Sequence, residues 1–275
     1  MRSRFVNILF IGLSMGSEAI YVHEGSANVL LLCVLVVFAT LCIALAGYLD
    51  NDRYDHEIDR ANGKEGIMVN KNIIFALYAS GIALGMLCGL FQFQGIWSRS
   101  LTHSLFFLTP AVLLHFYAST LSRYKGMGNI IIAGLCCFSL ALPGLITSCT
   151  RKDYWIALTP FLVILFVSTY IREIAKDAED EKGDVAHGRT TLPVFLGNYF
   201  TTYFTMLNFL TLALVVLGFG LYYKYTWIAI TLTSYLMVYN VLRKSFSWRK
   251  TQQVWKGFIA LGVLLRILFL HTDIL

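Results

Sequence analysis

The chain has 275 residues, of which 57% are hydrophobic and only 14% are charged. Soluble domains average about 25% charged residues, so this composition and the mean hydropathy of +0.66 exclude an ordinary soluble protein. No nucleic-acid-binding motif accompanies the net charge of +6, which instead suits contact with anionic lipid headgroups.

Apolar segments long enough to cross a bilayer, about 20 residues each, recur from end to end. They predict nine membrane-spanning helices, at residues 4–22, 28–50, 71–92, 101–122, 129–149, 152–176, 194–222, 226–244 and 252–273. These segments are too long and too continuously apolar for the strands of an outer-membrane barrel. We therefore expect an all-α membrane protein with one domain over residues 1–275. The basic start of the first segment resembles a signal peptide, but we expect it to open the first span.

The basic residues predict the orientation of these nine spans. Of the 22 Lys and Arg residues, 17 fall on the side of the N-terminus and four on the opposite side. Because short cytoplasmic loops are enriched in Lys and Arg, the N-terminus is expected in the cytoplasm. Loss of the first segment as a signal peptide would spoil the positive-inside parity, because the remaining connections would change sides. The two longest connections on the same side, residues 51–70 and 177–193, carry most of the acidic residues.

The third predicted span carries small residues at four-residue spacing. Gly81, Gly85 and Gly89 lie on one face of a helix. Small residues in this arrangement let helix backbones approach closely in lipid. We expect a structural role for this stripe.

One acidic pattern occurs twice. Asp52, Asp55 and Asp59 are spaced by three and then four residues, and the same spacing recurs at Asp177, Asp180 and Asp184. On a helix this spacing keeps the carboxylates on one face. The windows 50–65 and 173–184 together hold 12 of the 16 acidic residues. A lone run of this kind would fit a solvated loop, whereas its repetition on one side of the membrane favours a binding site.

Two carboxylate stripes facing each other would repel unless a cation lies between them. Mg²⁺ prefers oxygen ligands and often binds through one or two carboxylates together with substrate phosphates. Basic side chains in or beside the same loops are suited to phosphate oxygens: Arg60, Lys125, Arg172 and Arg189. The pattern therefore predicts a site for a diphosphate held by Mg²⁺.

Four segments resemble the motifs of the UbiA-like intramembrane prenyltransferases. Residues 51–60, NDRYDHEIDR, match the family's NDxxDxxxD motif. Residues 172–193 are similar to its second Asp-rich motif and the TLP that follows, and residues 117–129 resemble YSxxLKRxxxxGN. Arg4 and Asn7 resemble the RxxN in the first helix of many members. The matches occur in order along the chain.

This resemblance implies a bundle of nine transmembrane helices around a lipid-open cavity, with the active site facing the cytoplasm of a bacterial or archaeal cell. It implies transfer of a prenyl group from a prenyl diphosphate to a hydrophobic or aromatic acceptor, with Mg²⁺ as the cofactor. The expected partners are these substrates and membrane lipids, with no nucleic acid and no required protein partner.

The resemblance also assigns roles to individual residues. The expected catalytic residues are Asp55, Asp59, Asp180 and Asp184. The expected metal ligands are Asn51, Asp52, Asp55, Asp59, Asp177, Asp180 and Asp184. The expected substrate-binding residues are Asn7, Asn51, Arg60, Tyr117, Arg123, Lys125, Arg172 and Arg189.

Two departures from the family pattern affect these assignments. Ser122 stands where many members have Lys, which shifts the expected phosphate contact to Arg123 or Lys125. After Asn62 the chain reads GKEGIMV in place of the more usual KPxRP. The style of the second motif resembles the geranylgeranylglycerol-phosphate geranylgeranyltransferase-like branch, which favours a geranylgeranyl donor and geranylgeranylglyceryl phosphate as the acceptor.

Three other functions stay open from the sequence. Aromatic acceptors, 4-hydroxybenzoate or 1,4-dihydroxy-2-naphthoate, would use the same motifs. A cation transporter could use the acidic clusters, although transporter sites usually lie near the midplane on broken helices. A phosphoalcohol transferase also uses clustered acids, but its DGx2ARx8Gx3Dx3D pattern is absent from the sequence.

Overall fold

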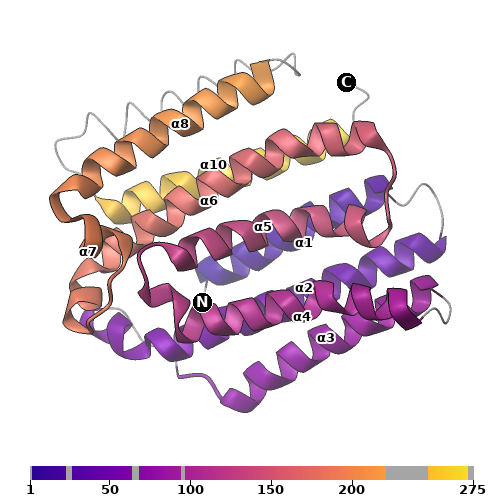
Figure 1. Cartoon of the computed structure of the whole chain (residues 1–275), viewed down its shortest axis with the longest axis horizontal. Coiled ribbons are helices and arrows are strands. Elements are labelled where there is room, and N and C mark those ends of the chain that lie inside the picture. Colours follow the sequence, from indigo (N-terminus) through magenta and orange to yellow (C-terminus); the bar gives the residue numbers. More distant parts are fainter. Residues whose placement is uncertain (1, 23–26, 64–67, 94–96, 221–246, 272–275) are drawn as a thin grey trace. The chain divides into compact units, whose positions relative to one another are not determined.

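The computed structural model describes residues 2–22, 27–63, 68–93, 97–220 and 247–271 (Figure 1). Within these ranges the regular structure is helical, with a single isolated parallel bridge between Tyr124 and Thr190. The predicted all-α class is therefore confirmed. The predicted span at 226–244 lies outside the described residues.

The helices follow the apolar segments along the chain. They are α1 (Arg2–Val22), α2 (Ala27–Ala61), α3 (Lys71–Phe93), α4 (Trp97–Ser119), α5 (Met127–Ile146), α6 (Lys152–Ala186), α7 (Leu192–Leu196), α8 (Phe200–Gly220) and α10 (Trp248–His271). Two 3-10 turns are η1 (Leu121–Arg123) and η2 (Gly197–Tyr199). In the described part of the chain, four helices are long and apolar enough to cross a membrane: Asn28–Ala61, Lys71–Leu90, Met127–Ile146 and Lys152–Ala186. The count of nine spans stays a prediction.

Two helices continue well beyond their apolar segments. α2 and α6 each have 35 residues. At about 1.5 Å per residue, such a helix exceeds the roughly 30 Å of a hydrocarbon core. Both acidic motifs therefore lie on helical extensions, so the acidic parts of the predicted connections 51–70 and 177–193 are helical as far as Ala61 and Ala186. α2 ends just before Gly63, whose φ of +71° is a conformation that favours glycine.

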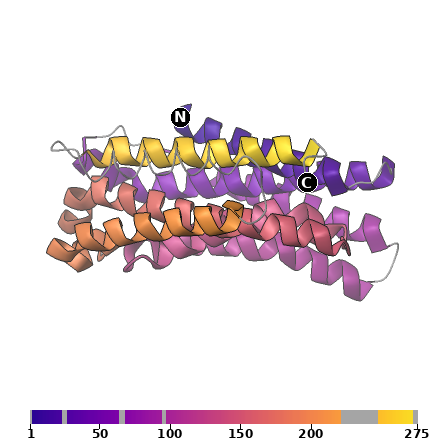
Figure 2. The same ribbon diagram turned by 90° about the horizontal axis from the view of Figure 1, so that it is seen from above.

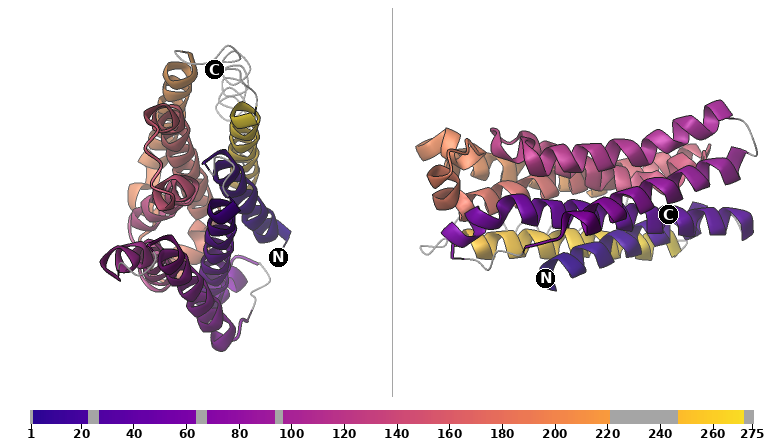
Figure 3. Two further views of the ribbon diagram at one scale, coloured as in Figure 1. Left: turned by 90° about the vertical axis from the view of Figure 1, so that its right-hand side faces the viewer. Right: turned by 90° about the horizontal axis from the view of Figure 1, so that it is seen from below.

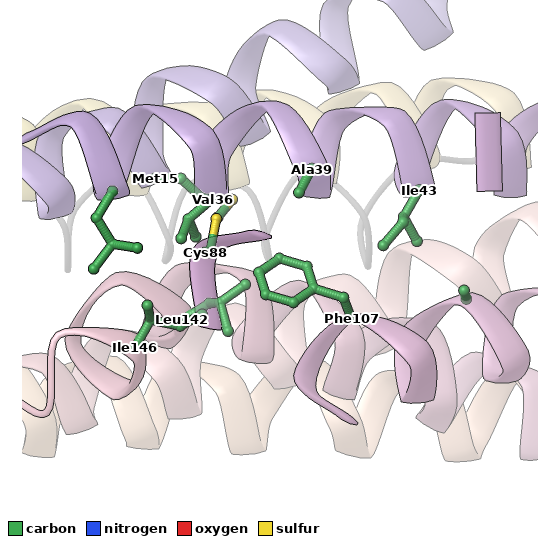
Figure 4. Packing of buried hydrophobic residues seen from close by; sticks show 10 residues of the cluster. Met15, Val36, Ala39, Ile43, Cys88, Phe107, Leu142 and Ile146 are labelled. Atoms are coloured by element: carbon green, nitrogen blue, oxygen red, sulfur yellow. The ribbon is translucent and has the colours of Figure 1, made fainter. Parts of the chain in front are cut away.

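A first compact unit comprises Met1–Leu121 and Phe138–Thr150. Within it, α2 packs against α1, α3 and α4 (Figure 3). The centre of the unit is a buried apolar cluster that includes Met15, Val36, Ala39, Phe107 and Leu142 (Figure 4). This packing holds the membrane part of α2, and so it supports the helix that carries the first acidic motif.

The glycine stripe on α3 makes the close approach that its spacing predicts. A Cβ atom at Gly81 would lie 2.5 Å from Ile43 Cγ1 and 2.8 Å from the carbonyl oxygen of Ala39. At Gly85 an added Cβ would overlap the side chain of Phe107. Since one obstacle at Gly81 is the backbone of α2, the conflict cannot be relieved by a side-chain rotation alone.

Replacing Gly81 with alanine should therefore lower the free energy of unfolding by about 1–3 kcal/mol, the usual cost of overpacking. Gly16→Ala is the matched control, because an added Cβ at Gly16 in α1 meets no heavy atom within 4 Å. Unfolding in detergent by a chemical denaturant would measure both variants. Equal stability of the two variants would contradict the close α2–α3 contact.

A second compact unit comprises Ser122–Cys137 and Arg151–Leu275. In this unit α6 lies beside α8 and packs against α7 and α10 (Figure 2). The buried cluster that joins these helices includes Ile171, Ile174, Ala175, Phe204 and Trp255. The first three of these residues lie on α6 just before the second acidic motif. The cluster therefore holds in place the helical turn from which that motif begins.

Candidate functional site

The first acidic motif lies on the C-terminal extension of α2. Asn51 and Asp55 are one helical turn apart, and Asn51 Nδ2 donates a hydrogen bond of 2.7 Å to Asp55 Oδ2. The other amide atom, Asn51 Oδ1, is buried and has no hydrogen-bond partner within the described residues. An amide oxygen held in this way is a suitable ligand for a hard cation.

The other acids of this motif differ in their exposure. Asp52 is buried, with 2% of its surface exposed, whereas Asp55 and Asp59 are partly exposed. Arg60 lies exposed in the last turn of α2, where a cation complements the negative end of the helix dipole. The predicted carboxylate stripe is therefore present on a helix, and Asp52 is its buried member.

Two more of the predicted substrate-binding residues lie in the same unit. Asn7 of α1 donates a hydrogen bond of 3.2 Å from Nδ2 to the hydroxyl oxygen of Tyr48 on α2. Since Tyr48 is three residues before Asn51, this bond brings Asn7 next to the start of the motif. Tyr117, near the end of α4, is buried, with 8% of its surface exposed.

The second acidic motif lies on the extension of α6. Asp177 Oδ2 accepts a hydrogen bond of 2.7 Å from Nδ2 of Asn129, a buried residue of α5. Asp180 is partly exposed. Asp184 is buried, accepts a hydrogen bond of 3.0 Å from Thr191 Oγ1, and has its Oδ1 3.9 Å from Arg189 Nη1.

Backbone hydrogen bonds join two loops beside this motif. The N–H of Lys125 donates to the carbonyl of Thr190 at 2.7 Å, and the N–H of Thr190 donates to the carbonyl of Arg123 at 3.0 Å. Two segments distant in sequence therefore meet: the loop before α5 and the loop that follows α6. The side chains of Arg123 and Lys125 are exposed, and Lys125 Nζ lies 4.2 Å from the centroid of the Phe195 ring.

Arg172 has a different environment from the other predicted phosphate-binding residues. It forms an ion pair with its neighbour Glu173, which is buried. Arg189 is also buried, whereas Arg123 and Lys125 are exposed. Of these four cations, the two in the loop before α5 have the side chains most accessible to an incoming anion.

The donor atoms fit Mg²⁺ by their chemistry. They are carboxylate and amide oxygens, which Mg²⁺ prefers, and Asn51 Oδ1 is a buried oxygen in need of a partner. Over the ranges that the structure describes, no three His, Cys, Asp or Glu side chains come close enough together to hold a metal by themselves. Mg²⁺ sites that rely on substrate phosphates need only one or two carboxylates.

The sequence matches the profile of the UbiA prenyltransferase family over residues 9–264. Among curated relatives, the digeranylgeranylglyceryl phosphate synthase of Methanothermobacter thermautotrophicus is 31% identical over 194 residues, which cover 70% of this chain and 65% of the relative. The protein of the same name from Methanothrix thermoacetophila is 34% identical over 170 residues, covering 60% of this chain and 58% of the relative. The chain thus spans less than two thirds of these relatives' length.

Two solved structures share the fold. One, from a study of digeranylgeranylglyceryl phosphate synthase in membranes, has a TM-score of 0.63 and 23% identity, and covers 96% of this chain and 99% of its own. The other, a UbiA homolog from Aeropyrum pernix, has a TM-score of 0.65 and 14% identity, covering 94% and 97%. The resemblance drawn from the motifs is confirmed.

Proposed function

The chain belongs to the UbiA prenyltransferase family, and we propose that it transfers a geranylgeranyl group from geranylgeranyl diphosphate to geranylgeranylglyceryl phosphate. The observation that carries the proposal is the similarity to several relatives named digeranylgeranylglyceryl phosphate synthase. The product in that name carries two geranylgeranyl groups, so an acceptor with one such group and a donor of the second would yield it.

The proposed architecture is a single domain of nine transmembrane helices around a lipid-open cavity, in a bacterial or archaeal cell membrane. Both acidic motifs are placed on the cytoplasmic side. This orientation is supported by the side of the predicted spans that holds 17 of the 22 basic residues. A membrane location suits a donor and an acceptor that both carry long hydrocarbon chains.

In the proposed reaction, the bond between the prenyl C1 and the diphosphate oxygen breaks, and C1 forms an ether bond to the acceptor hydroxyl oxygen. Asn51, Asp55 and Asp59 would hold the metal at the first motif, and the acids of the second motif would do so on α6. Mg²⁺ bound there supplies the positive charge that makes diphosphate a better leaving group. Arg123 and Lys125 bind phosphate oxygens, and a motif carboxylate or the released diphosphate accepts the proton of the acceptor hydroxyl.

Product formation from radiolabelled geranylgeranyl diphosphate tests this proposal. The purified protein in detergent with Mg²⁺ would receive geranylgeranylglyceryl phosphate, 4-hydroxybenzoate or 1,4-dihydroxy-2-naphthoate in separate reactions. Labelled ether lipid with the first acceptor alone, lost when a chelator removes Mg²⁺, is the expected result. Product with an aromatic acceptor alone would assign the chain to quinone synthesis. The absence of both product and diphosphate release would refute a prenyltransferase.

A further inference from the structure

A polar contact joins α2 to α4 at the point where the first acidic motif begins. Asp50, with 1% of its side chain exposed, has Oδ2 2.7 Å from Nδ1 of His115 on α4. With Asp50 as a carboxylate, which only accepts hydrogen bonds, the tautomer of His115 that carries its hydrogen on Nδ1 is the one that fits this contact. Arg53 Nη1 lies 3.9 Å from Asp50 Oδ1. Asp50 is thus held by two groups, one on its own helix and one on α4.

Aromatic contacts extend this polar cluster. The Tyr54 ring meets the His115 ring edge-on, with centroids 6.3 Å apart, and the Arg53 guanidinium lies 5.2 Å from the Tyr54 centroid. We call Asp50, Arg53, Tyr54 and His115 the α2–α4 clamp. None of the four has a role in the reaction proposed above.

Asp50 lies on the side of α2 away from Asp55 and Asp59. Successive helical residues are about 100° apart, so Asp50 lies roughly 140–180° from Asp55 and Asp59 around the helix axis. On α4, His115 and Tyr117 are two positions apart and therefore about 160° apart. Asp50 therefore contacts α4 from the side of α2 that faces away from Asp55 and Asp59.

The extension of α2 has a physical need for such support. Its acids at three- and four-residue spacing repel one another and weaken the helix. The buried apolar cluster of the first unit includes four residues of α2, which are Leu32, Val36, Ala39 and Ile43. All of these residues precede Asp50. Past that cluster, α2 is held by buried Ile58 and by the polar contacts of the clamp, and the latter join the start of the acidic motif to a histidine of α4.

We propose that His115 is a positioning residue that acts through Asp50. It fixes the rotation of the α2 extension, so that Asn51 and Asp55 are presented together to Mg²⁺ and diphosphate. It does not contact the substrate. The inference rests on the proposed function and adds to it the group that orients the first motif.

Substitutions at His115 can test whether the position of its Nδ1 atom matters for this role. The amide N–H of asparagine can take the place of imidazole Nδ1–H, whereas that of glutamine reaches the position of Nε2. We expect His115→Ala and His115→Gln to raise the Mg²⁺ concentration for half-maximal activity about tenfold, the scale of one lost charge-assisted hydrogen bond. His115→Asn should stay within about threefold of the wild type, and saturating Mg²⁺ should restore most of kcat in every variant.

Val112→Ala is the matched control, because Val112 is an exposed residue of α4 one turn before His115. A purely structural histidine would lower Tm without changing the Mg²⁺ dependence. Wild-type Mg²⁺ dependence in both His115→Ala and His115→Gln, or equal rescue by glutamine and asparagine, would overturn the proposal.

A second readout does not require prenyl transfer. Mg²⁺ titrated in the presence of inorganic diphosphate should raise Tm of the wild type, and His115→Gln should need about tenfold more Mg²⁺ for the same shift. If this holds while the wild type forms no product with any acceptor, the proposed function fails and the positioning role stands. If Mg²⁺ and diphosphate leave the wild-type Tm unchanged, both fail.

Discussion

Asp55→Asn should reduce the rate of prenyl transfer at least about 100-fold, because it removes a metal-binding charge worth several kcal/mol in the transition state. The substitution preserves the size of the side chain. An asparagine at this position can also present its amide oxygen to Asn51 Nδ2, which donates to Asp55 in the native protein. The helix should therefore fold as before, and the loss should fall on catalysis rather than on stability.

Glu57→Gln is the matched control for Asp55→Asn. It removes one carboxylate from the same helical extension, but Glu57 is exposed and lies two positions from Asp55, on the other side of α2. Its initial rate should stay within about twofold of the wild type, as expected for a surface charge. Initial rates at saturating Mg²⁺, with Tm as the check on folding, would measure both variants. Equal rates for the two variants would remove Asp55 from the metal site.

The sequence predicts the positions of the helices because hydropathy reports which segments can lie in lipid. The apolar segment at 71–92 corresponds closely to α3, Lys71–Phe93. Hydropathy does not report where a backbone stops being helical. The charged residues after Asp50 are compatible with a helix, so α2 continues to Ala61, and glycine, not polarity, ends it.

The sequence predicts those parts of the candidate site whose residues are close together along the chain. The spacing of the two acidic runs and the residues of the loop before α5 can be found by motif alone. The bond between Asn129 and Asp177 joins residues 48 apart, and that between Asp50 and His115 joins residues 65 apart. Such pairs depend on how helices pack. The available signal for the second pair was an acid at the end of the second predicted span and a histidine inside the fourth.

Asp184→Ala should lower the free energy of unfolding by about 3–5 kcal/mol, the usual cost of removing one partner from a buried ion pair. Asp184 and Arg189 are both buried, with 3% and 8% of their surfaces exposed. Alanine would leave the guanidinium of Arg189 without this carboxylate and Thr191 Oγ1 without its acceptor. The loop after α6 should then loosen, and unfolding by denaturant in detergent would measure the change.

Two further variants separate the structural contribution of Asp184 from its catalytic one. Glu181→Ala removes an exposed carboxylate from the same end of α6 and should change stability by less than about 0.5 kcal/mol. Asp184→Asn retains an oxygen that can accept from Thr191, so it should recover part of the lost stability while activity stays low. If Asp184→Asn recovered activity as well, the negative charge of Asp184 would have no part in binding metal. The residue would then serve only to hold Arg189 and Thr191 beside the end of α6.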